Sequence, residues 1–275
     1  MSRMNSASHC LHAIGWKLIV VLGVFTSPVG AQEVTDPEAR EVMNSMADEM
    51  DRFIDKMAEI PESTDTLQIE HEFTTNPNLT GPLAAAQMFA AEIMNFSVSE
   101  TNAYGAELEQ VGLLTVLDPV RLQTDDDYSE SRTMLAGARQ VIDKYRNRQH
   151  IIEDKVYSMF DELDMPAEMK DDFEAGVKQG LASGAINRTL LWDLEEQSLD
   201  QFDGIIDTLS SNAWEYDGEY ILFESDDAAA KFNDHLATID AIFQEQIALQ
   251  RSVVEDNMRR QKRGTRERPV QPNDN

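Results

Sequence analysis

Cysteine is almost absent from this chain. Cys10 is the single cysteine among 275 residues, and it lies within the first 31 residues, which read as a removable export signal. Without Cys10 the chain forms no disulfide, no thiolate zinc site, no iron–sulfur cluster and no thioether-linked haem. Cys10 also precedes the apolar run of that segment, whereas a lipid-modified cysteine follows such a run. We therefore expect no lipid anchor.

Histidine is nearly as scarce. Beyond residue 31 only His71, His150 and His235 remain, each on a different expected element. The Glu-x-x-His pairs of di-iron bundles are absent, because the residues three positions earlier are Gln68, Asn147 and Phe232. His71 lies between two glutamates but lacks the second histidine of a zinc protease motif. We expect surface or structural roles for all three histidines.

Motifs for nucleophilic and phosphate chemistry are missing. The segment 180–184 reads Gly-Leu-Ala-Ser-Gly, with its serine one place away from that of a Gly-x-Ser-x-Gly elbow, and no glycine-rich phosphate loop occurs. The acidic clusters 125–127, 161–164 and 171–174 do not follow a calcium-binding loop, and they suit solvated helix faces and helix starts. We predict a non-enzymatic protein. A hydrolase built on a carboxylate pair stays open as a third hypothesis, because only spatial separation identifies such a pair.

Basic residues are few. Lys and Arg number 23 against 51 Asp and Glu, a net charge of −28. Without Arg3 and Lys17 of the signal segment the count is 21 against 51, or −30. A body this acidic repels nucleic acid phosphates and anionic lipids. We expect no nucleic acid partner.

The remaining cations gather at the C-terminus. Six of them face only Glu267 and Asp274, so residues 259–275 carry +4; the six are Arg259, Arg260, Lys262, Arg263, Arg266 and Arg268. One interpretation is a helix end whose cations stabilise the negative end of the dipole, followed by disorder. The other is a basic arm that binds an anionic surface, either a phosphorylated lipid headgroup or the acidic face of a second copy. Any membrane contact is expected through this arm alone.

The first 31 residues predict export. Arg3 and Lys17 supply positive charge, residues 18–25 are apolar, and Val-Gly-Ala at 29–31 suits signal peptidase cleavage between Ala31 and Gln32. The apolar run is shorter than the roughly 20 residues needed to cross a bilayer, which favours a cleaved signal over an anchor. A bacterial periplasm is the expected compartment, and no cofactor is expected.

Helical periodicity dominates the rest. Apolar stripes predict helices over 37–60, 82–117, 135–163, 185–209 and 226–261, with a shorter helix over 167–182, a break at 180–184 and a polar interruption near 148–150. Residues 62–81 read as a connector. The fold class expected is all-α, an elongated antiparallel bundle forming one domain over 37–261. Residues 32–36 are expected to be flexible and 262–275 to form a basic disordered tail.

One short β-hairpin is expected at about 214–223, between the last two helices. Asp217-Gly218 suits a two-residue turn, which would pair Trp214 with Ile221. A lone hairpin is marginally stable in water, so it should pack on the bundle end or bind a partner. The candidate partner-binding residues are Trp214, Tyr216 and Tyr220, together with Arg259, Arg260, Lys262 and Arg263.

Two functions from different classes remain. The first is an exported interaction or scaffold module that binds a protein or another envelope partner. The alternative is a bundle that binds a small ligand or metal in its interior, because of the polar break near Gln149 and because Met43, Met46 and Met50 could offer thioether ligands to Cu(I). The same methionine spacing is also that of an ordinary core stripe.

Overall fold

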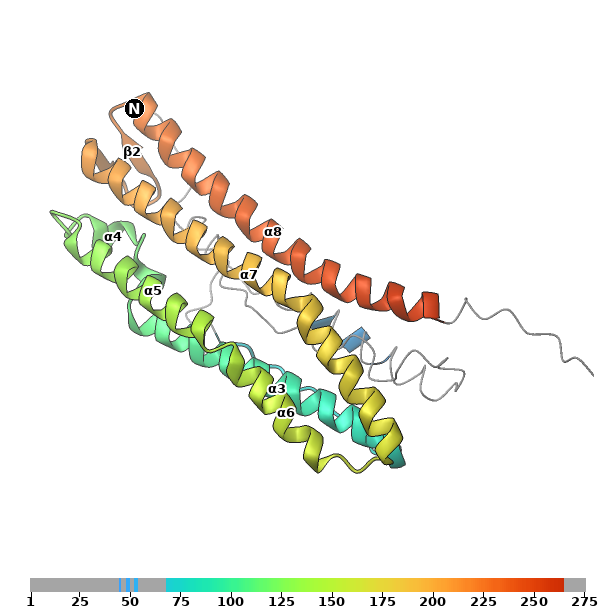
Figure 1. The fold of residues 1–275 in the computed structure, drawn as a ribbon. Helices are drawn as coiled ribbons and strands as arrows, with labels where there is room; N and C mark the ends of the chain where they lie inside the picture. Colours follow the sequence, from blue (N-terminus) through green and yellow to red (C-terminus); the bar gives the residue numbers. More distant parts are fainter. Residues whose placement is uncertain (1–44, 46–47, 50–51, 54–67, 265–275) are drawn as a thin grey trace, which may run out of the picture.

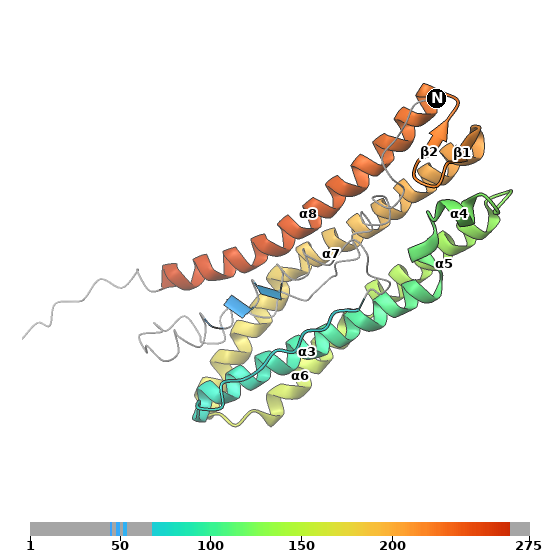
Figure 2. The ribbon, with the colours of Figure 1, turned by 180° about the vertical axis from the view of Figure 1, so that it is seen from behind.

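The computed structural model describes residues 45, 48–49, 52–53 and 68–264, and over 253–264 it describes the backbone alone. The elements over 81–264 are α3 (Gly81–Gln110), the 3₁₀ turn η2 (Leu113–Thr115), α4 (Pro119–Leu122), α5 (Ser129–Asn147), α6 (His150–Glu162), α7 (Ala167–Ser211), β1 (Trp214–Tyr216), β2 (Ile221–Phe223) and α8 (Asp226–Gly264). Helix α3 runs the length of the molecule, α5 and α6 return along it, α7 runs the length again and α8 returns beside α7 (Figures 1 and 2). The expected elongated antiparallel bundle, with a hairpin between the last two helices, is confirmed.

Helix α3 ends earlier than predicted. Pro82 occupies the first turn, as expected, but Gly112 adopts a left-handed conformation (φ +85°) that an α-helix excludes. A Cβ atom there would lie 3.1 Å from Met134 Cε. The chain therefore leaves the helix at Gly112 and continues through η2 and α4, so the single helix predicted over 82–117 is wrong in its last turns.

The single helix predicted over 135–163 is wrong, because the chain breaks at the polar interruption near 148–150 and forms two helices, α5 and α6. The backbone N–H of Ile151 donates to Arg148 O at 2.9 Å and that of Ile152 donates to Gln149 O at 3.2 Å, which makes a tight turn. The two helices that flank it form one long, interrupted return path along α3 (Figure 2).

The break predicted over 180–184 does not occur. Helix α7 runs for 45 residues without interruption, which is roughly 68 Å at 1.5 Å per residue. A glycine inside a helix costs about 1 kcal/mol relative to alanine. Gly180 and Gly184 both lie on the buried face of α7 beside Val177 and Leu181, and the packing of that face outweighs their low propensity.

The hairpin forms, but its register differs from the prediction. Trp214 pairs with Phe223 and Tyr216 with Ile221, so the loop has four residues instead of two. The reason is the Asp217 side chain, whose Oδ1 accepts from the backbone N–H of Glu219 at 2.9 Å and of Tyr220 at 2.7 Å.

Helix α8 follows the hairpin and continues three residues beyond the predicted end at 261. Lys262 and Arg263 therefore belong to the helix and not to a tail. In the described part of the chain, no helix is long and apolar enough to span a bilayer.

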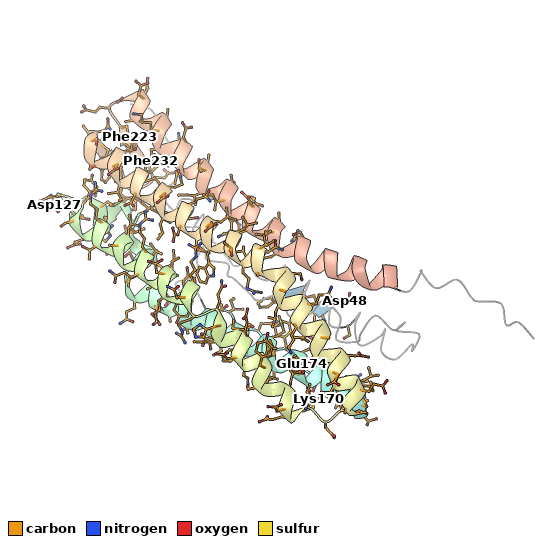
Figure 3. The ribbon with its side chains drawn as sticks, viewed as in Figure 1. Asp48, Asp127, Lys170, Glu174, Phe223 and Phe232 are labelled. Atoms are coloured by element: carbon orange, nitrogen blue, oxygen red, sulfur yellow. The ribbon has the colours of Figure 1, made fainter. Side chains whose placement is uncertain are left out.

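Over the part of the chain that the structure describes, two apolar clusters account for most of the core. The larger one lies toward the hairpin end, where Phe223 packs on Phe232 with ring centroids 5.4 Å apart (Figure 3). The smaller one lies toward the opposite end and is centred on Phe89, whose ring lies 5.1 Å from those of Phe160 and Phe173. The break between α5 and α6 is located between the two clusters.

An extended segment precedes α3 and is held against it by side-chain amides. Asn102 accepts from Ile69 N at 2.7 Å and donates to Ile69 O at 3.1 Å. Asn95 makes the same pair of bonds with Phe73, at 2.7 and 2.9 Å. These amides satisfy backbone groups that a sheet partner would otherwise bind.

Candidate functional site

The hairpin aromatics close the end of the bundle. Trp214 Nε1 donates to the hydroxyl of Tyr128 at 2.7 Å, and the rings of Trp214 and Tyr216 pack against the larger core cluster. The Tyr216 hydroxyl donates to Gly218 O at 3.0 Å, and Tyr220 is half-buried. Trp214 and Tyr216 therefore contribute much of their surface to the protein's own core.

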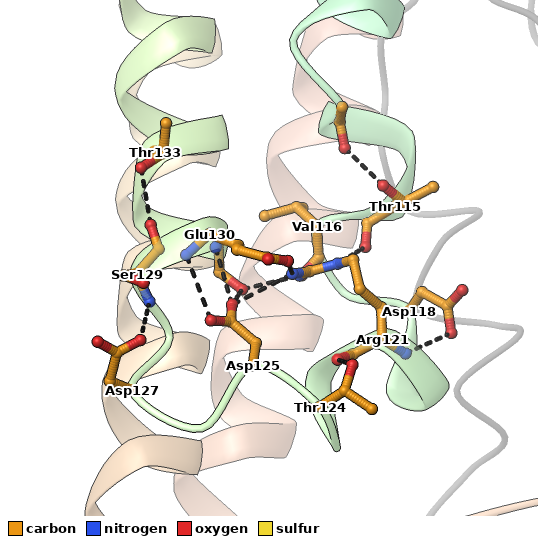
Figure 4. A network of polar contacts seen from close by, with 12 residues as sticks. Thr115, Val116, Asp118, Arg121, Thr124, Asp125, Asp127, Ser129, Glu130 and Thr133 are labelled. Atoms are coloured by element: carbon orange, nitrogen blue, oxygen red, sulfur yellow. Dashed lines mark hydrogen bonds and ion pairs between the residues drawn. The ribbon is translucent and has the colours of Figure 1, made fainter.

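A polar network supports the same end (Figure 4). Asp125 is buried, and its carboxylate accepts from Ser131 N at 2.9 Å, from Ser131 Oγ at 2.7 Å and from Arg121 Nη1 at 3.2 Å. Burial alone would raise the pKa of Asp125, but these hydrogen bonds outweigh it and lower the pKa. The acidic cluster 125–127 thus organises the start of α5 and the turn that carries Tyr128.

The predicted basic residues are Arg259, Arg260, Lys262 and Arg263, and all lie in the last turns of α8. In Figures 1 and 2 these turns (red) diverge from α7. Met43, Met46 and Met50 fall outside the described residues, as do Arg266 and Arg268.

The described residues contain no group of three or more histidine, aspartate, glutamate or cysteine side chains that could hold a metal ion. His150 Nδ1 lies 3.0 Å from Asn147 O at the start of α6. His235 Nδ1 lies 2.9 Å from Gln201 Oε1, and its ring packs on Gly204 of α7. These two histidines occupy surface and packing positions.

The structure contains a cavity at the break between α5 and α6, which the sequence pattern does not show. It has a volume of about 40 Å³, and its lining includes Glu100 and Tyr104 from α3, Tyr145 and Arg148 from α5 and its end, and Arg188 and Trp192 from α7. It lies where the two core clusters meet. The polar break that motivated an interior ligand site is therefore one wall of an actual cavity.

Three aromatic rings form the frame of this cavity. The Tyr104 ring lies 5.1 Å from that of Tyr145 and 5.6 Å from that of Trp192, both edge to face. The Tyr145 hydroxyl donates to Glu107 Oε1 at 2.9 Å. Burial, then the hydrogen bond to Glu107, raises the pKa of Tyr145 to about 12, so it stays neutral at physiological pH.

Arg188 is the buried cation of the cavity, with 6% of its surface exposed. Its Nη2 donates to Glu153 Oε1 at 3.2 Å and to Leu181 O at 3.1 Å. Among the described residues, neither Arg188 Nη1 nor the neighbouring Trp192 Nε1 has a hydrogen-bond acceptor. Burial lowers the pKa of Arg188 and Glu153 opposes that effect, as expected for a cation with incomplete compensation.

Glu195, on the same helix as Arg188, interacts with Tyr104 of the cavity frame. It is 3% exposed, its Oε1 accepts from Gln246 Nε2 of α8 at 3.1 Å, and the Tyr104 hydroxyl is its second partner. Burial raises the pKa of Glu195 to about 8, against the opposing effect of these two hydrogen bonds. Glu195 is therefore neutral at pH 7.

The sequence does contain a signal for this site. Arg188 and Glu195 lie seven residues apart on the same stripe of α7 as Leu181, Leu191 and Trp192. A cation and an acid on an otherwise apolar helical stripe indicate buried charges, and buried charges need partners or a function. Periodicity alone could not place Glu100 and Tyr145 beside them.

Comparison of the chain with known protein families, with curated proteins and with solved structures finds no match.

Proposed function

We propose that this protein is an exported, non-enzymatic interaction module of the cell envelope, which binds an anionic partner through the C-terminal turns of α8. The observation that supports it is the continuation of α8 to Gly264, which puts Arg259, Arg260, Lys262 and Arg263 on the last turns of one helix. The backbone of this helix end diverges from α7 (Figures 1 and 2).

Charge supplies the driving force. The chain as a whole has a net charge of −28, whereas residues 259–275 carry six cations against two acids. Each cation near an anionic surface contributes about 1 kcal/mol at low salt, so four on one helix end could hold such a surface. The acidic body repels the same surface, which restricts binding to the tip.

The same cations also suit the negative end of the α8 dipole, an effect worth 0.3–1 kcal/mol for each residue in the last turn. That local role predicts a stability change and no partner. The two roles are therefore separable by experiment.

The test is affinity capture from envelope extracts with the full chain as bait, first checked by intact mass for a chain that begins at Gln32. The variant replaces Arg259, Arg260, Lys262 and Arg263 by glutamine. We expect the captured partner to be lost in this variant, and also at about 1 M salt, where the Debye length is about 3 Å.

A matched control removes four cations from the body instead. Arg132, Lys144, Lys155 and Lys178 sit in surface ion pairs that contribute little to stability, and their replacement by glutamine makes the same change in net charge. This control should keep the partner. Capture of the same partner by the wild type and the α8 variant at low salt contradicts the proposal.

A further inference from the structure

The cavity at the break between α5 and α6 combines two features of a binding site. It is a hollow inside the bundle, and two buried N–H groups on its lining residues have no acceptor among the described residues. From this geometry we propose that the cavity binds the carboxylate group of a small organic acid, with Arg188 Nη1 and Trp192 Nε1 as the donors. The inference concerns the interior and is independent of the proposed role of α8.

The donors explain why the ligand is an acceptor. A buried donor without an acceptor costs about 1–3 kcal/mol, and more when it is charged, so proteins rarely leave two together. Arg188 and Trp192 are four residues apart on α7 and therefore neighbours on one helical face. A carboxylate has two oxygens that can each accept one of these N–H groups.

The charges explain why the acceptor is anionic. The Arg188 side chain is 7% exposed, whereas its partner Glu153 is 40% exposed and touches Arg188 through one contact of 3.2 Å. The positive charge is thus deeper in the protein than the negative charge that balances it. Glu195, a buried acid nearby, has a pKa of about 8 and is mostly protonated at pH 7, and burial raises the pKa of the Tyr104 hydroxyl, which stays neutral.

The volume limits the size of the ligand. One water needs about 10–15 Å³ on the scale in which this cavity measures about 40 Å³, so a group of about three heavy atoms fits. Cofactor-sized pockets are about 300–1,000 Å³. A carboxylate fits, and a nucleotide or a haem does not.

The rim shows where the rest of the acid would lie. Glu100 and Arg148 form an ion pair of 3.4 Å, and their side chains are 24% and 34% exposed, so this part of the cavity lining reaches solvent. Ile152 and the Tyr145 ring give this path an apolar wall. A short aliphatic stem can therefore extend outward past the Glu100–Arg148 pair.

Trp192 also provides the measurement. The chain has three tryptophans, so replacing Trp16 and Trp214 by phenylalanine leaves Trp192 as the single fluorophore. The full chain with these two changes is titrated with acetate and with propionate at constant ionic strength. We expect a saturable change in Trp192 emission and a rise in melting temperature with both acids.

Acetamide, chloride and phosphate complete the titration series. Acetamide has the shape of acetate without its charge, and we expect no saturable response to it or to chloride. An equal response to acetamide or chloride overturns the assignment of a carboxylate. A stronger response to phosphate than to either acid also overturns it. So does a titration in which neither acid gives a saturable response up to about 10 mM, a concentration high enough to detect weak binding.

Variants of the donors are measured by calorimetry and melting temperature in the otherwise unchanged chain. Arg188→Met and Trp192→Phe should each lower carboxylate affinity at least about tenfold, because each removes one buried hydrogen bond to a charged group. The matched controls are Arg132→Met, whose arginine pairs with Asp207 on the surface, and Trp214→Phe, whose indole donates to Tyr128. Both controls should bind as the wild type does.

Trp192→Phe keeps a ring in the cavity frame and loses the N–H, so it tests the site even where Arg188→Met fails to fold. Wild-type affinity in a folded Trp192→Phe variant overturns the proposal. Equal losses in Trp192→Phe and in the distant Trp214→Phe overturn it too, because they indicate a general loss of stability.

Discussion

Replacing Glu195 by glutamine should make the protein more stable above pH 8 and leave its stability near pH 5 almost unchanged. In the folded chain the pKa of Glu195 is about 8, whereas a free glutamate side chain has a pKa near 4.5. Between these values the folded state keeps a proton that the unfolded chain has released. The stability that Glu195 contributes is therefore full below about pH 4.5, falls as the pH rises, and is lost above about pH 8.

The pKa difference sets the size of the effect. At about 1.4 kcal/mol for each pKa unit, a rise from 4.5 to about 8 corresponds to at most about 5 kcal/mol between low and high pH. Water entry around an ionised Glu195 would reduce this value. Glutamine keeps an acceptor for Gln246 and presents a donor to the Tyr104 hydroxyl, so it mimics the neutral acid.

The assay is urea unfolding of the wild type and of Glu195→Gln at several pH values from 5 to 9. The observable is the difference between the two free energies of unfolding, because this difference cancels the repulsion among the many other acids. We expect a difference near zero at pH 5 that grows to several kcal/mol in favour of the variant by pH 9.

Glu107→Gln is the matched control. Burial would raise the pKa of Glu107, but hydrogen bonds from Lys144 and Tyr145 outweigh burial and lower it, so this side chain is ionised throughout the range. Its variant should differ from the wild type by a constant amount. A difference between wild type and Glu195→Gln that is also constant from pH 5 to pH 9 refutes the reasoning, because Glu195 would then be ionised in the folded chain.

Two further predictions concern packing. Gly204→Ala should destabilise the protein by about 1–2 kcal/mol. A Cβ atom at position 204 would lie 2.3 Å from His235 Cε1, so the His235 ring must move and lose its contact with Gln201. This loss outweighs the gain in helix propensity from glycine to alanine. In a His235→Ala background the same change should stabilise by up to about 1 kcal/mol, and an unchanged sign in a thermal unfolding series contradicts this account. Asn102→Asp replaces the amide that donates to Ile69 O by a carboxylate oxygen, which cannot donate. We expect the free energy of unfolding to fall by about 1–3 kcal/mol and hydrogen exchange to become faster in the extended segment. Equal exchange rates in the variant and the wild type argue against the amide pairing.

The secondary structure was largely predictable, because most of it depends on local pattern. The long amphipathic helices, the proline in the first turn of α3 and the hairpin before α8 all carry local signals, and all occur. The errors lie where a distant contact outweighs a local preference. Burial carries α7 through Gly180 and Gly184, and the hairpin register follows the side-chain bonds of Asp217.

Some features of the candidate surfaces follow from the local sequence, and others depend on tertiary contacts. Export and the basic end of α8 follow from composition and order along the chain, and they stay predictions. The partial burial of Trp214 against Tyr128 depends on a contact across 86 residues, which no local pattern contains.

By itself, the sequence determined the compartment to be expected, the charge of the body and the periodicity that makes this a bundle of long helices, since each depends on which residues occur and in what order. Tertiary structure alone decided the cavity. Glu100 on α3, Arg148 at the break and Arg188 on α7 are far apart in the chain and meet because the return path of α5 and α6 is interrupted between the two core clusters. Burial there, and not residue type, raises the pKa of Glu195. Burial also leaves Arg188 Nη1 and Trp192 Nε1 without hydrogen-bond acceptors among the described residues.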